Sequence, residues 1–381
     1  MTLLLFIAIL SLLVFVHELG HFLAAKKAGI FVEEFGFGLP PRIWGKKIGE
    51  TIYSINALPI GGFVKLYGED GPSFAKASAG KAYFEKSIPR RLSVLLAGVT
   101  MNVVLAIVSF SILYFVLGIP TKTGKIKIVG ITKDSPAQFA GLKEEDQIIG
   151  VDGQRVLSVD EFVQLTGEKA GNKIQLEIGR DKDNPCKPLE GNQVLGGATS
   201  SEQGFNCLGK NLLVSLIPRE SPPEGEGALG VVISEIELKK YPWWQMPYLG
   251  AREGFKESLS WAGMILSSLK KTLVTLIVMG KVPRDVAGPI GIFQITGQVA
   301  KDGFLAILQF LGILSVNLAI INILPFPALD GGRLIFLGYE AVFRKKISPK
   351  IEILVNQVGM AILLSIMALI TVNDVLRLLK K

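Results

Sequence analysis

The chain has 381 residues, 49% of them hydrophobic, and its mean hydropathy is +0.43. A chain of this size and apolarity is not an ordinary soluble enzyme, and we expect the excess in membrane-spanning runs. The formal net charge of +8 does not indicate a nucleic-acid binder, because the basic residues gather in short loops beside apolar segments. With only two cysteines, no disulfide framework holds the fold.

Four apolar runs are predicted to cross a membrane as helices. The first covers residues 1–24. A secretory signal peptide is the alternative there, but no Lys or Arg precedes the run. The other three runs are 92–119, 304–329 and 353–372. A fifth stretch, 258–279, carries two lysines in its middle and is expected to lie on the membrane surface as an amphipathic helix.

Basic residues predict which side of the membrane each loop faces. Residues 25–91 contain eleven Lys or Arg, and the loop between the third and fourth runs contains five more. The positive-inside rule places both loops in the cytoplasm and the segment 120–303 outside. No transit-like Ser/Arg-rich leader precedes the first run, so the expected location is a bacterial cell membrane rather than a plastid.

The two histidines lie together in the first predicted span, as His17-Glu18-Leu19-Gly20-His21. Residues i and i+4 of a helix share one face about 6 Å apart. Two imidazoles there can bind one Zn²⁺, with Glu18 beside the metal to take a proton from its bound water. The alternative is that these are polar residues at helix contacts. Ionisable groups inside a span are costly, however, and are functional candidates by default.

A catalytic zinc site usually has three protein ligands, so another helix must supply the third. The candidate is Asp330, at the end of the third run, where two prolines stop the helix and two glycines after the aspartate free the backbone. A turn with a solvated Asp330 is the alternative. In the predicted orientation, the first and third runs both enter the membrane from the outer side. His17 lies about 24 Å along the first helix, and Asp330 lies 26 residues beyond Phe304. Both residues are therefore expected near the cytoplasmic side.

Between the spans, residues 31–67 alternate in a way that predicts strands joined by turns. In the outer segment we expect a strand at 125–131, a helix starting at 135–136, a hairpin turn at Asp152-Gly153 and a helix at 158–166. The polar insert 181–211 holds both cysteines. Cys186 and Cys207 either pair in an oxidising compartment or remain two free thiols.

These motifs together resemble the site-2 protease family of intramembrane zinc metalloproteases, in its bacterial branch with a PDZ domain. The resemblance covers nearly the whole chain. It rests on the HELGH motif, on Asn-x-x-Pro-x-Pro-x-Leu-Asp-Gly at 322–331 and on Pro-Ile-Gly-Gly-Phe-Val-Lys at 59–65. Where the family often has Ala-Gly-Pro-x-x-Asn in the second helix, this chain has Val99 in place of the proline.

The resemblance implies a polytopic α-helical membrane protein with four transmembrane helices, a membrane-associated β-hairpin or sheet and an inserted extracytoplasmic PDZ domain of α+β type. Its expected parts are a membrane domain at 1–119, the PDZ domain at 124–234, interfacial amphipathic helices at 240–303 and a second membrane domain at 304–381. The implied site consists of zinc ligands His17, His21 and Asp330, catalytic base Glu18, and substrate-binding residues Asn322, Gly61, Gly62, Phe63 and Val64.

The implied activity is zinc-dependent cleavage of transmembrane segments in regulated intramembrane proteolysis. Expected partners are the lipid bilayer and single-span membrane proteins already shortened by another protease, such as anti-sigma factors or remnant signal peptides, with no nucleic acid. Within the family the PDZ domain either filters substrates by size or binds a carboxyl-terminal tail. Other hypotheses are a non-catalytic PDZ membrane adaptor, an ion transporter and a membrane-bound zinc protease with its active site outside the membrane.

Overall fold

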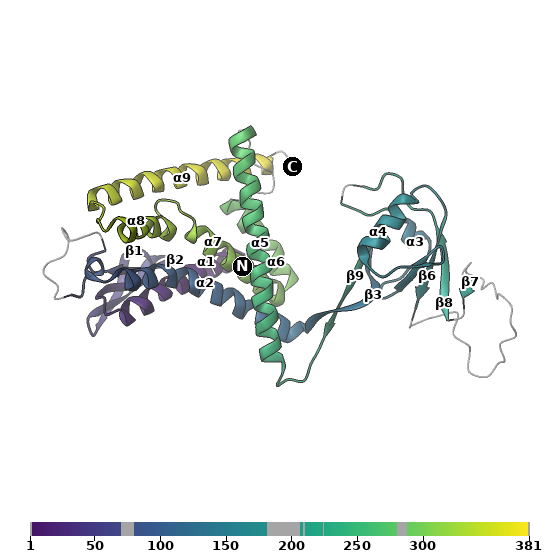
Figure 1. The fold of residues 1–381 in the computed structure, drawn as a ribbon, viewed down its shortest axis with the longest axis horizontal. Coiled ribbons are helices and arrows are strands. Elements are labelled where there is room, and N and C mark those ends of the chain that lie inside the picture. Colours follow the sequence, from purple (N-terminus) through teal and green to yellow (C-terminus); the bar gives the residue numbers. More distant parts are fainter. Residues whose placement is uncertain are drawn as a thin grey trace. The chain divides into compact units, whose positions relative to one another are not determined.

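The chain divides into two compact units in the computed structural model (Figure 1). One unit combines Met1–Leu117 with Pro242–Lys381, and the other is Gly118–Tyr241, inserted between these two parts of the sequence. The structure describes residues 2–69, 80–180, 206–208, 210–223, 225–279 and 288–379.

Among the described residues of the first unit, four helices are long and apolar enough to cross a membrane, which agrees with the four predicted spans. They are α1 (Thr2–Lys27), α2 (Ile88–Leu117), α7 (Phe304–Ile323) and α9 (Pro349–Leu379).

The bounds of all four helices differ from those of the predicted runs, and for two of the helix ends the cause is local. The second helix ends at Leu117, because Gly118 has φ of 108° and the next strand follows directly. The third ends at Ile323 instead of continuing to residue 329. Pro325 and Pro327 follow within four residues, and proline neither donates a helical hydrogen bond nor lets the preceding turn stay helical.

Helices α1, α2 and α7 form the centre of the first unit. Buried Phe110 of α2 packs with Val316 and Ile320 of α7. A second apolar cluster joins α1 to α7 through the buried residues Ile9, Leu13, Phe310 and Leu311. The backbones of α1 and α2 approach closely at Gly20, where a Cβ atom would lie 2.4 Å from the carbonyl oxygen of Ala97. Only a residue without a side chain permits this approach.

Two long strands follow α1, as the alternation at 31–67 predicted: β1 (Val32–Ile48) and β2 (Thr51–Leu66). Each strand bends, and the register pairs Phe35 of β1 with both Val64 and Tyr53 of β2. The end of β2 thus contacts β1 on one side. It contacts α1 on the other, where a Cβ at Gly61 would lie 2.9 Å from Cγ1 of Val14. A short 3₁₀ turn, η2 (Tyr83–Glu85), precedes α2.

The second unit is an antiparallel sheet with two short helices, α3 (Pro136–Phe139) and α4 (Val159–Glu168). Its strands run in the order β7-β8-β6-β4-β3-β9, and β5 pairs with β4. Their bounds are β3 Ile119–Ile131, β4 Gln147–Val151, β5 Gln154–Arg155, β6 Ile174–Gly179, β7 Asn206–Leu208, β8 Asn211–Leu216 and β9 Val231–Lys239. The strands bury an apolar cluster that includes Ile128, Ile148, Leu176, Ile178 and Leu212.

The local signals predicted for this unit are confirmed. Ser135 and Ser158 cap α3 and α4, each accepting a backbone N–H three residues later. Asp152 and Gly153, at φ of 50° and 78°, form the turn that joins β4 to β5. Both cysteine thiols lie outside the part of the chain whose side chains are described.

Two further helices belong to the segment 240–303: α5 (Met246–Met279) and α6 (Pro289–Asp302). Helix α5 begins well before the predicted residue 258. Its first turns pack on α2, where a Cβ at Gly254 would lie 2.7 Å from the carbonyl oxygen of Ile107. It is not among the four helices that are long and apolar enough to span. Its placement on the membrane surface stays a prediction.

Candidate active site and metal centre

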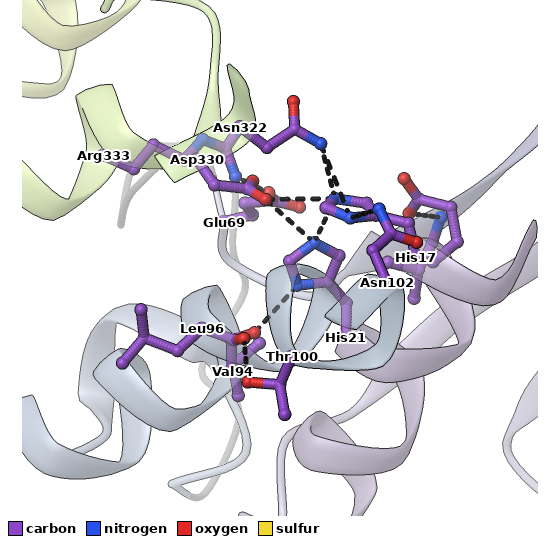
Figure 2. Close-up of polar contacts among 12 residues, drawn as sticks. His17, His21, Glu69, Val94, Leu96, Thr100, Asn102, Asn322, Asp330 and Arg333 are labelled. Carbon is purple, nitrogen blue, oxygen red and sulfur yellow. Dashed lines mark hydrogen bonds and ion pairs between the residues drawn. The ribbon is translucent and has the colours of Figure 1, made fainter. Parts of the chain in front are cut away.

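The structure brings together the three residues proposed as ligands. His17 and His21 share one face of α1, both are buried, and their Nε2 atoms lie 3.1 Å apart. Oδ2 of Asp330 lies 3.0 Å from Nε2 of His17 and 3.3 Å from Nε2 of His21. Figure 2 shows the carboxylate and the two rings pointing toward one another. One potential ligand atom from each residue lies within 4.8 Å of the others.

Asp330 reaches the histidines because the chain turns sharply after α7. The backbone leaves the helix at Ile323, and Asp330 is the first residue of α8 (Asp330–Phe343). A Cβ at Gly331 would lie 1.9 Å from the carbonyl oxygen of Leu324, and one at Gly332 2.5 Å from that of Phe326. Neither glycine has a positive φ. They are needed because the start of α8 packs on the loop backbone, not for the backbone freedom expected from the sequence.

Two ion pairs hold α8 in place. Arg91 of α2 donates to both carboxylate oxygens of Glu340, at 2.8 and 2.6 Å, and this pair is largely buried. Arg333, one turn after Asp330, pairs with Glu69 just beyond the end of β2 (Figure 2). The Arg91–Glu340 pair is bidentate, and a bidentate pair fixes geometry as well as charge. The position of Asp330 therefore depends on both α2 and the β1–β2 sheet.

The donor atoms fit a bound metal cation. Nδ1 of His21 lies 2.8 Å from the carbonyl oxygen of Val94. A carbonyl only accepts, so Nδ1 carries the proton and the Nε2 lone pair is free. That lone pair faces Oδ2 of Asp330, which is buried without a hydrogen-bond partner. Electron-rich atoms that face one another are stabilised by a shared cation. Their separations of 3.0 to 3.3 Å match ligand atoms around a tetrahedral zinc, about 3.3 Å apart for bonds of 2.0–2.1 Å.

Glu18 lies between the ligand cluster and the end of β2. Its Oε2 accepts a hydrogen bond of 3.1 Å from the backbone N–H of Val64. A Cβ at Gly62 would lie 3.9 Å from Cγ of Glu18. Val64, Glu18 and Asp330 line one cavity of about 200 Å³. Of the residues predicted to present substrate, Gly62 and Val64 therefore adjoin Glu18. Gly61 packs on Val14 of α1, and Phe63 pairs with Gly36 of β1.

Asn322 belongs to the last turn of α7. Its Nδ2 lies 3.5 Å from Nδ1 and 3.4 Å from Nε2 of His17, so its amide adjoins the ligands (Figure 2).

The sequence interpretation assigned no role to Asn102, Arg333 or Glu69. Asn102 of α2 is fully buried, and its amide lies 3.2 Å from Nδ1 of His17. Arg333 and Glu69 line the same cavity as Glu18. One signal was available for Asn102, because an amide in the middle of an apolar span needs a partner. No comparable signal pointed to Arg333 and Glu69, since charged residues next to a span are common.

Comparison with known proteins agrees with this geometry. The model of Peptidase family M50 matches residues 5–366, a range that includes every residue of the site. A Clostridium perfringens protein, named as a candidate zinc metalloprotease, is 36% identical over 96% of each chain. The zinc metalloprotease RasP of Oceanobacillus iheyensis is 28% identical over 98% of each chain. The regulator of sigma-W protease RasP of Bacillus subtilis is 28% identical over 99% of each chain. The chain therefore belongs to peptidase family M50.

Proposed function

We propose that this protein is a zinc-dependent endopeptidase that cuts transmembrane segments of other membrane proteins within the bilayer. The observation that carries the proposal is the convergence of two imidazoles and one carboxylate on α1 and α8, beside a further carboxylate. Helices α1 and α7, which lead to the site, are apolar enough to span a membrane. The names of the Clostridium perfringens and Oceanobacillus iheyensis relatives as zinc metalloproteases support the metal and the reaction.

His17, His21 and Asp330 would hold the zinc ion. When bound, zinc polarises the scissile carbonyl and lowers the pKa of a coordinated water towards neutrality. Glu18 takes the proton from the water and passes it to the leaving amine. The N–H of Val64 orients Glu18 for this transfer. Asn322 lies close enough to the ligands to bind or position the substrate backbone.

The metal requirement tests the proposal most directly. Protein purified in detergent is expected to contain one zinc ion per chain by elemental analysis. Removal of zinc by a chelator should abolish cleavage of a reconstituted single-span substrate, and added zinc should restore it. Asp330→Ala should lose the metal, because it removes one of three ligands. Full activity in metal-free protein would refute the proposal.

The end of β2 is proposed to receive the unwound substrate as an added strand. Peptide bonds within a helix are shielded by their own hydrogen bonds, so a substrate must unwind before attack. Within a bilayer the freed backbone groups need new partners. The position of this segment supports the role. Val64 is paired with Phe35 of β1, whereas its backbone N–H points to Glu18. The edge of β2 that is not paired with β1 therefore borders the proposed catalytic base.

Val64→Pro should leave zinc bound but slow cleavage, because proline has no N–H to donate to Glu18. Loss of a hydrogen bond to a charged group costs about 1.5–3 kcal/mol, or roughly 10- to 100-fold in rate. The rate constant on a single-span substrate measures the effect. Val64→Ala keeps the N–H and is the matched control. Equal rates for both variants would count against this role.

The second unit is proposed to be an extracytoplasmic PDZ domain, with the active site nearer the cytoplasm, as the distribution of basic residues predicts. Its antiparallel sheet flanked by two short helices supports this identification. We propose that it restricts entry to substrates already shortened by another protease. Because the name of the Bacillus subtilis relative refers to sigma-W, membrane-bound anti-sigma factors are the proposed substrates, with remnant signal peptides as a second class.

Removal of the second unit tests the selection of substrates by length. Ile119 and Lys239 are paired in the sheet, so the two ends of the unit are adjacent and residues 118–241 can be replaced by a short linker. The intact protein should cleave a shortened substrate and spare the full-length form, whereas the deletion variant should cleave both. Gel analysis of the two substrates in the same membranes distinguishes the cases. Selection that survives the deletion would exclude this unit as the filter.

A further inference from the structure

Three residues of α2, spaced by four, line the side of the histidine pair. Val94, Gly98 and Asn102 lie on one face of the helix, as this spacing requires. The carbonyl oxygen of Val94 meets Nδ1 of His21, and the amide of Asn102 meets Nδ1 of His17 (Figure 2). Each imidazole therefore has its own partner on α2, on the ring nitrogen that faces away from Asp330.

The two partners differ in chemistry. The Val94 carbonyl can only accept a hydrogen bond, so the tautomer of His21 is determined. The Asn102 amide has a donating end and an accepting end. Its Nδ2 faces His17 at 3.2 Å, whereas its Oδ1 is buried and has no hydrogen-bond partner. A half-turn of the amide about its last side-chain bond exchanges the two ends and brings Oδ1 to the ring.

Asn102 is held rigidly in this position. Its side chain is fully buried. The hydroxyl of Ser315 on α7 donates to the backbone carbonyl of Asn102 at 2.8 Å, which ties this turn of α2 to α7. Burial and this backbone contact keep the amide beside His17, whichever of its two ends faces the ring.

We propose that Asn102 is the positioning residue for His17, its Oδ1 accepting the Nδ1 proton and leaving Nε2 free to ligate zinc. The inference rests on the proposed zinc site and adds a residue to it. Metal-binding histidines generally donate their other ring N–H to an oxygen acceptor, which fixes the ring and its tautomer. His21 has the Val94 carbonyl for this purpose. Asn102 gives His17 the equivalent.

Zinc affinity of the full-length protein tests the inference. Asn102→Leu keeps the approximate size of the side chain but accepts no hydrogen bond. Zinc affinity, measured by competition with a chromophoric chelator, should fall about 10- to 100-fold, as is typical when such a partner is lost. Asn102→Asp retains an acceptor and should restore most of the affinity. Ser109→Ala is the matched control, because Ser109 is buried on the same helix and bonds only to its own helix backbone.

A spectroscopic measurement separates positioning from a general structural role. The chain has only two histidines, so protein labelled with ¹⁵N-histidine reports on His17 and His21 alone. In zinc-loaded protein, Asn102→Leu should shift the Nδ1 resonance of His17 and leave that of His21 unchanged. A shift of both rings, with equal loss of affinity in the Asp and Leu variants, would overturn the inference in favour of a packing role.

Zinc binding by wild-type and variant proteins distinguishes failure of this inference from failure of the proposed zinc site. If wild-type protein binds zinc and Asn102→Leu binds it equally tightly, Asn102 has no positioning role and the zinc site stands. If wild-type protein binds no zinc, or if His17→Ala binds it as tightly as wild type, the zinc site itself is refuted and the inference fails with it.

Discussion

Glu18→Gln is expected to retain zinc and to lose nearly all cleavage of a single-span substrate. Glutamine has almost the same shape as glutamate, and its amide oxygen can still accept the N–H of Val64 that Glu18 accepts at 3.1 Å. It cannot take a proton from water at neutral pH. General-base catalysis contributes about 10²- to 10⁴-fold to the rate, so the rate constant for cleavage should decrease by a factor in this range. Single-turnover cleavage in proteoliposomes measures it, with zinc content determined on the same samples.

The matched control is Glu50→Gln, the same change at an exposed carboxylate that pairs with Lys81 outside the site. Its cleavage rate should equal that of wild type. The Glu18→Gln protein also offers a practical use, because an enzyme that binds without cutting traps its substrates in native membranes. Wild-type cleavage by the Glu18→Gln variant would remove Glu18 from the mechanism, whatever its zinc content.

Gly98→Ala is expected to empty the metal centre. A Cβ at residue 98 would lie 2.4 Å from Nε2 of His21 and 2.8 Å from Nε2 of His17. Real Cβ contacts are not this short, so either the imidazoles turn away or α2 moves off α1. Both responses separate the ligand atoms. We expect zinc affinity to fall by about 100-fold, the upper end for changes next to ligands, and cleavage to fall with it.

Helix propensity predicts the opposite sign, so the experiment is decisive. Alanine is more favourable than glycine inside a helix by about 0.8–1.0 kcal/mol, and an unobstructed site should gain from the substitution. Gly263→Ala in α5 is the control, because nothing lies within 4 Å of its added Cβ. It should leave zinc binding intact. If Gly98→Ala also binds zinc as tightly as wild type, the close packing of α2 on the histidines is not what holds the site together.

Much of the fold could be predicted from local sequence. Long apolar runs identified the four described helices that are long and apolar enough to span, because crossing a bilayer requires both length and apolarity. The Asp152-Gly153 turn and the serine caps of α3 and α4 followed from residue chemistry at single positions. The pairing of His17 with His21 followed from the helical repeat alone. Each of these features depends on residues close together in the chain.

The remaining features depend on contacts between distant segments. The end of α7 and the function of Gly331 and Gly332 are set by how the loop 324–329 packs beneath α8. The bends in β1 and β2, which bring Val64 to Glu18, are visible only in the register of the sheet. No periodicity in the sequence distinguishes a strand that borders an active site from one that does not.

The sequence by itself predicted the chemistry of this protein: which side chains are expected to bind zinc, which carboxylate is expected to act as a base, and that they lie in or beside apolar runs. Tertiary structure alone decided how α2 contributes. Gly20 and Gly98 allow α1 and α2 to approach until backbone and amide groups of α2 meet the imidazoles. The physical reason is that hydropathy depends on each residue alone and predicts only whether a segment is stable in the bilayer. The hydrogen-bond partner of a buried polar group is determined only when two helices come into contact.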